Sequence, residues 1–321
     1  MALTYEGLNA FTNDKILPRS VEVVFANDPA FVRLHTKNAE RITGGVQIRQ
    51  PLTIDELKGG VAGRGEGFDI DYVVTDTALA VNLKLYWTNI TLIGFDEIQN
   101  QMPESVFSLV ESKWENAART MAKLLAQGMY RPGQGSRSKH MNGLAEWYDD
   151  GNTYASVGGI ARSDVNTVGV VGGLNAYVAD ITSWSLKQVN TAYAASWWGP
   201  DQVDLIVCPV AGWQKFWESL QPLQQIMGQG GDIYDVGFGG FRFNGADVVV
   251  SRYIPDGFIY GLNTEYIMWL FSSVPKFQFG FTGWKQDQRS IDVAGQFLAA
   301  NNLICPSPRT GFKLTSSTSE F

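Results

Sequence analysis

Apolar residues recur between residues 103 and 128 with the period of an α-helix. They are separated by steps of three and four residues: Phe107, Val110, Trp114, Ala117, Met121 and Leu124. Pro103 suits the first turn of a helix, and Gly128 suits its carboxyl-terminal cap. The pattern predicts a helix over 103–128, roughly 38 Å long at 1.5 Å per residue. Its single apolar stripe would lie across a sheet, and Glu115 and Arg119 would pair on its solvent side.

Alternating positions before this helix predict strands. Residues 45–56 and 68–77 alternate and enclose "GGVAGRGEG" at 59–67, in which five of nine residues are glycine. This arrangement predicts a long hairpin with a mobile tip. The tip carries the residues that we expect to contact other copies of the chain: Lys58, Gly59, Gly60, Arg64 and Glu66. In the next strand, Val81, Leu83, Leu85 and Trp87 form the apolar side of the alternation, which is expected to be buried, and Ile90 and Leu92 are expected to continue this buried strand.

The rest of the chain mixes short helices and strands. Residues 1–44 form an arm without a core of its own, which must lie on the rest of the chain or on a neighbour. Helices are expected at 184–198 and 212–223, and a buried strand at 203–210. The sequences "NGAD" at 244–247 and "PDG" at 255–257 predict tight turns. The predicted fold class is therefore α+β.

Charge and composition exclude several function classes. The net charge is −7 and the pI about 5, so a nucleic-acid reader with a basic face is not expected. The basic residues at 130–140 are interpreted as a solvated loop. No signal peptide or membrane span is expected, because no basic segment precedes an apolar run and no stretch of eighteen apolar residues occurs.

No group of residues with catalytic or metal-binding spacing stands out. Cys208 and Cys305 lie in apolar runs and are expected to be reduced core residues. His35 and His140 have no metal-ligand partner at a useful spacing. The pairs Asp69/Asp71 and Asp149/Asp150 are expected on solvated surfaces. The glycine-rich tip lacks the Lys-Ser/Thr of a phosphate loop. We therefore expect no catalytic, cofactor-binding or metal-binding residues and no enzymatic activity.

Four segments resemble, in their order, one known family. They are residues 85–128, "VGGIARSD" at 157–164, residues 241–267 with "GLNTEY", and "NNLICPSPR" at 301–309. Together they resemble the major capsid proteins of tailed bacteriophages, which have the HK-ninety-seven-type fold. The resemblance spans most of residues 45–310.

This resemblance implies a domain plan and a function. It implies an N-terminal arm (1–44), an extended hairpin loop (45–85), a peripheral domain (86–164 and 266–321) with the spine helix 103–128, and an axial domain (165–265). It implies a non-enzymatic subunit whose pentamers and hexamers form an icosahedral shell around double-stranded DNA. The chain would then be a virion protein, assembled in the host cytoplasm, that contacts DNA weakly and without sequence specificity.

Further partners and alternatives follow from the same resemblance. A separate scaffolding protein and a portal are expected, since the arm is short for a built-in scaffold. Some family members join a lysine to an asparagine; Lys58 is a conceivable donor, although no marker for the partner is present. An encapsulin-type shell that holds enzyme cargo shares the fold. An enzyme or lectin-like domain that uses its many tryptophans remains a third reading.

Overall fold

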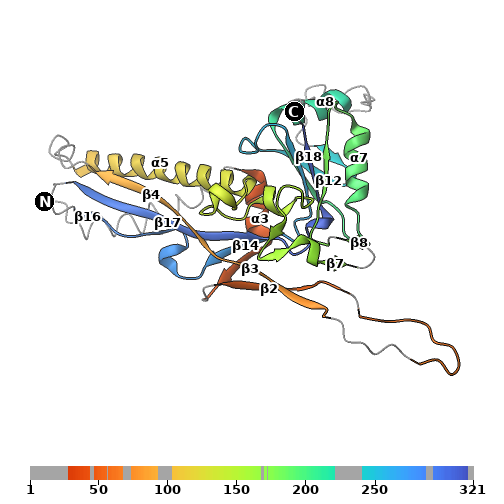
Figure 1. Ribbon diagram of the computed structural model, residues 1–321. Coiled ribbons are helices and arrows are strands. Elements are labelled where there is room, and N and C mark those ends of the chain that lie inside the picture. Colours follow the sequence, from red (N-terminus) through yellow and green to blue (C-terminus); the bar gives the residue numbers. More distant parts are fainter. Residues whose placement is uncertain are drawn as a thin grey trace, which may run out of the picture. The chain divides into compact units, whose positions relative to one another are not determined.

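A computed structural model describes most of the chain (Figure 1). The described residues are 28–43, 47–55, 57–67, 74–92, 103–167, 170–171, 173–220, 241–286 and 292–316. The chain forms two compact units: unit 1 comprises 1–45, 83–143 and 268–303, and unit 2 comprises 46–82, 144–267 and 304–321. Each unit combines helices with a sheet, which confirms the α+β class.

Unit 1 is a helix packed on a sheet. Its long helix α5 (Pro103–Tyr130) lies along β4 (Lys84–Leu92) and β17 (Val293–Ile304), as Figure 1 shows. β17 pairs with β4 antiparallel from Lys84 to Leu92. The remaining strands of the sheet are β1 (Ala39–Ile42), β14 (Met268–Ser272), β15 (Gly280–Phe281) and β16 (Lys285–Gln286). Short 3-10 turns lie at η2 (Gly135–Arg137) and η5 (Pro275–Phe277).

The apolar stripe of α5 faces this sheet, as its period predicts. Val110, Trp114 and Met121 are completely buried. The Trp114 ring packs edge-on against Phe281 and Phe297, at centroid distances of 4.9 and 5.5 Å. On the opposite side, Arg119 lies 3.6 Å from the Glu115 carboxylate. The side chain of Phe107 lies outside the described residues.

The helix ends two residues later than the sequence indicates, and Gly128 does not cap it. Gly128 is inside α5, where a Cβ atom would lie 2.6 Å from the Tyr86 hydroxyl oxygen. That hydroxyl accepts a hydrogen bond from the Met141 backbone N–H at 3.0 Å. Glycine is therefore present because β4 approaches the helix closely here, and the sequence alone cannot distinguish this role from a cap.

Replacing Gly128 with alanine should destabilise unit 1 despite the better helix propensity of alanine. The added methyl group would collide with the Tyr86 hydroxyl, and overpacking of this kind costs about 1–3 kcal/mol. Urea unfolding would measure the loss. In a Tyr86→Phe background the same change should be neutral or stabilising, because the colliding oxygen is absent and propensity then dominates. Equal costs in both backgrounds would contradict the proposed collision.

The expected buried side of β4 is wrong for Leu85 and Trp87 and confirmed for Ile90. Leu85 and Trp87 are 50% and 56% exposed, whereas Tyr86 and Ile90 are buried. The strand carries apolar residues on both sides. Alternation defines the two sides of such a strand but does not show which one the helix covers.

The described part of the arm packs within unit 1. Helix α3 (Pro29–Lys37) begins at Asp28, whose carboxylate accepts a hydrogen bond from the Ala30 N–H at 3.0 Å. The Tyr130 hydroxyl donates to the same carboxylate at 3.1 Å. The Phe31 ring packs edge-on against Trp269 at 4.6 Å. The sequence left open whether the arm lies on the rest of the chain or on a neighbour. Residues 28–42 lie on the rest of the chain.

Unit 2 contains a second six-stranded sheet with helices packed on it. The strand order is β11 (Phe241–Phe243), β12 (Ala246–Val250), β10 (Leu205–Cys208), β13 (Phe258–Leu262), β18 (Phe312–Thr315) and β9 (Tyr177–Asp180). Helix α7 (Leu186–Ala195) packs on β9 and β18, and α8 (Val210–Leu220) packs on β10 and β12. The predicted helices and central strand are confirmed with shifted ends.

Smaller elements complete unit 2. They are α6 (Leu144–Trp147), β5 (Ser156–Val157), β6 (Ile160–Ala161), η3 (Arg162–Asp164), β7 (Asn166–Thr167), β8 (Val170–Val171) and η6 (Pro308–Thr310). Asn244 and Gly245 join β11 to β12 with positive φ angles of 48° and 90°, which confirms the predicted tight turn.

The grouping of segments differs from the domain plan that the resemblance implied. The plan placed residues 144–164 and 304–321 in the peripheral domain, whereas both group with unit 2, together with residues 46–82. β18 shows the reason, because it lies between β13 and β9 in the sheet of unit 2. An apolar run predicts a strand, but it does not identify the sheet that the strand joins.

Candidate intersubunit site

The hairpin that carries the candidate contact residues begins with two paired strands of unit 2. β2 (Ile48–Thr53) and β3 (Asp76–Val81) run antiparallel, with Ile48 opposite Val81 and Thr53 opposite Asp76. The return strand therefore pairs from Asp76, later than the predicted 68–77. Residues 68–73, which include Asp69 and Asp71, lie outside the described residues.

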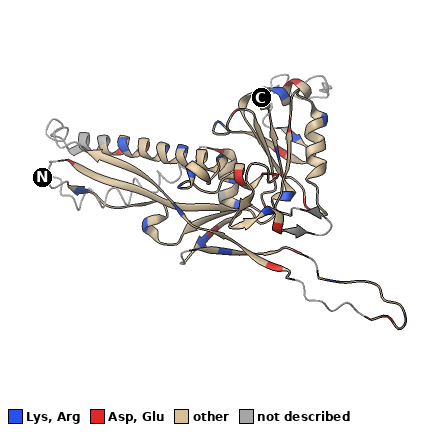
Figure 2. Cartoon of the chain, viewed as in Figure 1, with Lys and Arg blue, Asp and Glu red and all other residues tan. Residues whose placement is uncertain are grey.

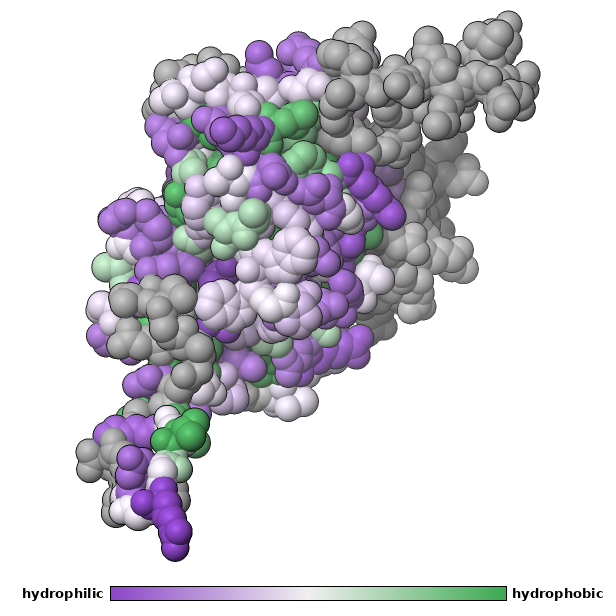
Figure 3. Space-filling view, turned by 90° about the vertical axis from the view of Figure 1, so that its right-hand side faces the viewer, coloured by the Kyte–Doolittle hydropathy of each residue, from purple (hydrophilic) through white to green (hydrophobic). Residues whose placement is uncertain are grey.

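Among the described residues of unit 2, none covers the hairpin tip. Residues 57–67 are all exposed, and Leu57 and Val61 expose 77% and essentially all of their surface. Cβ atoms added at Gly59, Gly60, Gly65 or Gly67 would meet no atom within 4 Å. Figure 3 shows hydrophobic residues beside strongly hydrophilic ones at this end of the hairpin. Large apolar side chains that are exposed beside polar ones are typical of a binding surface.

The tip nevertheless contains one defined turn. The Glu66 N–H donates to the Gly63 carbonyl at 3.2 Å, and the Glu66 carboxylate accepts from the Gly63 N–H at 2.6 Å. Gly65 has a φ of +91°, which a residue with a side chain rarely adopts. This turn engages the carboxylate of Glu66 locally and leaves Arg64 exposed at its corner. Glu66 and Arg64, which the sequence placed in one group, therefore differ in the structure: Glu66 stabilises the turn and Arg64 is exposed on it.

The base of the hairpin rests on the turn between β5 and β6. The Ala80 N–H donates to the Gly158 carbonyl at 2.7 Å. Gly158 and Gly159 both have positive φ angles, of 57° and 79°. A Cβ atom at Gly158 would lie 2.8 Å from a methyl group of the fully buried Leu79 and 3.5 Å from the Trp147 ring. The glycine therefore allows β3 to approach the turn closely.

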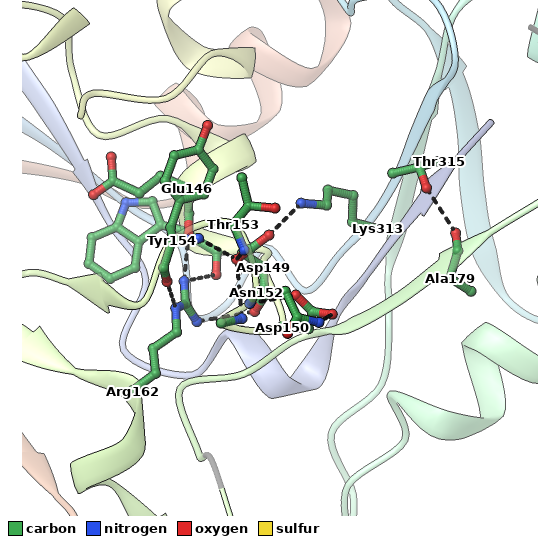
Figure 4. Close-up of polar contacts among 12 residues, drawn as sticks. Glu146, Asp149, Asp150, Asn152, Thr153, Tyr154, Arg162, Ala179, Lys313 and Thr315 are labelled. Atoms are coloured by element: carbon green, nitrogen blue, oxygen red, sulfur yellow. Dashed lines mark hydrogen bonds and ion pairs between the residues drawn. The ribbon is translucent and has the colours of Figure 1, made fainter. Parts of the chain in front are cut away.

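A buried arginine lies directly after this turn (Figure 4). Arg162 is 2% exposed, and its guanidinium donates to five backbone carbonyls. The measured distances are 2.6 Å to Glu146, 2.9 Å to Tyr154, 3.1 Å to Asp149 and 3.2 Å to Trp147, and Leu174 is a fifth acceptor. One side chain thus gathers several separate stretches of loop, and burial lowers its pKa.

Asp149 links the same loop to the sheet. It is 1% exposed, and its carboxylate lies 2.9 Å from the Lys313 ammonium on β18 (Figure 4). Backbone N–H groups of Gly151, Thr153 and Tyr154 also donate to it, at 3.1, 3.2 and 2.9 Å. Burial by itself raises the Asp149 pKa, but the Tyr154 N–H and Lys313 outweigh it and hold the pKa below its usual value.

The expectation of a solvated Asp149/Asp150 pair is therefore wrong for Asp149. Asp150 is partly exposed and accepts from the backbone and side chain of Asn152. The partner of Asp149 is 164 residues away in the sequence, so no local pattern reveals the pair. The sequence also did not predict the burial of Arg162, because "VGGIARSD" entered the interpretation only through its resemblance to capsid proteins.

Among the remaining candidates, both cysteines and His140 lie in the described part of the chain. Cys208 and Cys305 are buried free thiols, as expected, and burial raises the pKa of each to about 12. His140 packs edge-on near Tyr86 at 6.2 Å; the side chain of His35 is outside the described residues. Among the described residues, no group of His, Cys, Asp and Glu could hold a metal ion.

Figure 2 shows that Lys and Arg residues as well as Asp and Glu residues occur in both units. Residues 135–139 of the basic loop are exposed, in agreement with a solvated loop. Within the described part of the chain, no helix combines the length and the apolar character needed to cross a bilayer.

Similarity to known proteins is evident in structure but not in sequence. No family model and no curated protein matches the chain. The capsid asymmetric unit of cyanophage A-1(L) is similar over 88% of this chain and 92% of that chain, with 12% identity and a TM-score of 0.60. A structure from Mycobacterium phage Bobi is similar over 89% and 90%, with 12% identity and a TM-score of 0.54.

A shell protein of another kind also matches. The holo-SrpI encapsulin complex from Synechococcus elongatus is similar over 98% of this chain and 96% of that chain, with 11% identity and a TM-score of 0.53. Most of these structural neighbours are capsids of tailed phages. The chain therefore has the fold of tailed-phage major capsid proteins, the HK-ninety-seven-type fold, as its sequence resemblance implied.

Proposed function

We propose that this chain is the major capsid protein of a tailed phage, a structural subunit that forms an icosahedral shell around double-stranded DNA. The observation that carries this proposal is the uncovered hairpin tip on a capsid fold. Leu57 and Val61 are exposed there, and no atom lies within 4 Å of a Cβ placed at Gly59 or Gly60. Such a segment gains its contacts from a second copy of the chain.

The tip has the chemistry of an adaptable contact surface. Its apolar residues offer area to bury, and Arg64 offers a charged group at a fixed corner. The glycines on either side of the Gly63–Glu66 turn let one sequence fit several neighbour geometries, at an entropic cost on ordering. We assign the intersubunit contact to Lys58, Gly59, Gly60, Arg64 and Glu66, with Glu66 holding the turn that presents Arg64.

The assembled form follows from the same proposal. Copies would gather as pentamers and hexamers, with residues 165–265 as the main part of the axial domain and with residues 86–143 and 268–303 as the peripheral domain around α5. The hairpin loop 45–85 would reach a neighbouring copy. The chain would act in the virion after assembly in the host cytoplasm, with a separate scaffolding protein and a portal. Contact with DNA would be weak and non-specific, since the net charge is −7.

Bulky residues at the glycine tip should block assembly without unfolding the subunit. Gly59→Trp/Gly60→Trp places two large side chains where the isolated chain leaves open space. We therefore expect the assembled fraction, measured by negative-stain microscopy and light scattering, to fall at least tenfold. The unfolding midpoint of the unassembled subunit should stay unchanged.

The matched control is Gly59→Ala/Gly60→Ala, which alters the backbone preference in the same way but adds little volume. It should assemble nearly as well as the unchanged chain. Normal shells from the tryptophan variant would refute the intersubunit role of the tip.

An encapsulin-type shell with enzyme cargo is the second candidate, favoured by the similarity to the SrpI encapsulin over nearly the whole of both chains. The content of purified particles distinguishes the two functions. Packaged double-stranded DNA supports the phage capsid, whereas a co-purifying enzyme and no nucleic acid supports the nanocompartment.

A further inference from the structure

We infer that the turn Gly158–Gly159 fixes the direction in which the hairpin leaves unit 2, and that the hydrogen bonds of Arg162 hold this turn in place. We call residues 157–162 the hairpin anchor. They act as positioning residues for assembly and do not themselves contact a neighbour. This inference rests on the shell-forming function proposed above, and it assigns a physical role to "VGGIARSD".

The first step is the direct contact between the anchor and the hairpin. The Gly158 carbonyl accepts from the Ala80 N–H at 2.7 Å, and Ala80 lies at the base of β3 opposite Arg49 of β2. Leu79 is fully buried beside Gly158. Both a backbone hydrogen bond and a packed side chain therefore define where β3 sits on the turn.

The second step is the fixation of the turn itself. β5 and β6 pair through Ser156 and Ala161. Arg162 closes the base of this pair, because its N–H donates to the Ala155 carbonyl and its Nε to the Tyr154 carbonyl, both at 2.9 Å. Five carbonyl acceptors for one buried guanidinium leave it few alternative positions.

The third step connects the turn to the sheet of unit 2. The Asp149 carbonyl accepts from Arg162 at 3.1 Å, and the Asp149 carboxylate lies 2.9 Å from Lys313 on β18. Figure 4 shows the polar contacts from Lys313 through Asp149 to Arg162. The backbone of β6 and the hydrogen bond from Ala80 to Gly158 continue this connection to the base of β3. The direction of the hairpin is thereby coupled to the position of β18.

Because the hairpin is long, a small change of direction at its base moves its tip by a large distance. The chain between Ala80 and Arg64 can extend over about 50 Å at ~3.3 Å per residue. A tilt of about 10° at the base would then displace the tip by roughly 9 Å, by the same arithmetic. That displacement exceeds the tolerance of specific side-chain contacts, so a disturbed anchor would misplace an intact tip.

Two alanine substitutions in the same turn test the inference. Gly158→Ala introduces a Cβ 2.8 Å from Leu79, whereas at Gly159 the nearest atom to a new Cβ is 4.0 Å away, on Ala80. Both positions have positive φ, so both variants carry similar backbone strain. Only Gly158→Ala should displace β3.

The expected result has two readouts. In the unassembled subunit, the Ala80 amide should exchange with deuterium at least tenfold faster in Gly158→Ala than in Gly159→Ala, while the amides of β10 stay protected in both. The assembled fraction of Gly158→Ala should be about tenfold lower than that of Gly159→Ala. Adding Leu79→Ala to Gly158→Ala removes the colliding methyl group and should recover part of the assembly.

Equal exchange of Ala80 in the two variants, or equal assembly, would overturn the inference. If the unchanged chain forms neither shells nor species of five and six copies, the proposed function fails, and the Ala80 exchange rates still decide whether the anchor holds the hairpin. The two failures are thus distinguishable.

Discussion

Replacing Trp114 with alanine is expected to lower the free energy of unfolding of the subunit by about 3–5 kcal/mol. Trp114 is completely buried between α5 and the sheet of unit 1, where its ring packs edge-on against Phe281 and Phe297. Truncation removes this apolar area and leaves a cavity that the long strand β17 cannot readily close. Urea unfolding of the unassembled subunit would measure the change.

Arg119→Ala is the matched control on the same helix. Arg119 is exposed and its ion pair with Glu115 is 3.6 Å long at the surface, so the cost should stay below about 1 kcal/mol. Similar midpoints for the Trp114 and Arg119 variants would mean that the stripe of α5 does not face a core.

Replacing Asp149 with asparagine should cost about 3–5 kcal/mol, because it leaves the Lys313 ammonium buried without its counter-charge. Lys313 is 6% exposed and lies 2.9 Å from the Asp149 carboxylate. The side chains have almost the same shape, so lost charge dominates the effect. Adding Lys313→Met should restore part of the stability, since the unpaired buried ammonium is then removed as well.

The same ion pair predicts a dependence of stability on pH. The pKa of Asp149 is lowered in the folded state, so its contribution is complete above the unfolded value of about 3.9. The contribution is lost as the pH falls below that value toward the folded pKa. The gap in unfolding midpoint between the unchanged chain and Asp149→Asn should therefore narrow at acid pH. A gap that stays constant from pH 7 to pH 3 would contradict a charged Asp149 in the folded subunit.

Local patterns in the sequence were sufficient for the elements whose determinants lie close together. The helical stripe located α5 and its buried Trp114, and Asn244-Gly245 located a turn that requires positive φ. The glycine density at 59–67 located the uncovered hairpin tip. In each case the residues that determine the structure are neighbours in the chain.

Features that depend on distant segments could not be predicted. Gly128 resembled a cap because its actual neighbour, Tyr86, belongs to another element. Trp87 was expected inside because alternation cannot choose between two apolar faces of β4. Asp149 appeared solvated because Lys313 joins the site from β18. Two adjacent glycines followed closely by an arginine were the available signal for the hairpin anchor, and their meaning depends on β3 lying against them.

The mass of the purified full-length chain in solution tests the central claim most directly. Sedimentation velocity should show closed particles, or species of five and six copies if a scaffold is required, in place of the 35.4-kDa single chain. A single-chain species at every concentration and salt condition, with the amides around Arg64 protected from exchange, would contradict a subunit that completes its contacts through its copies.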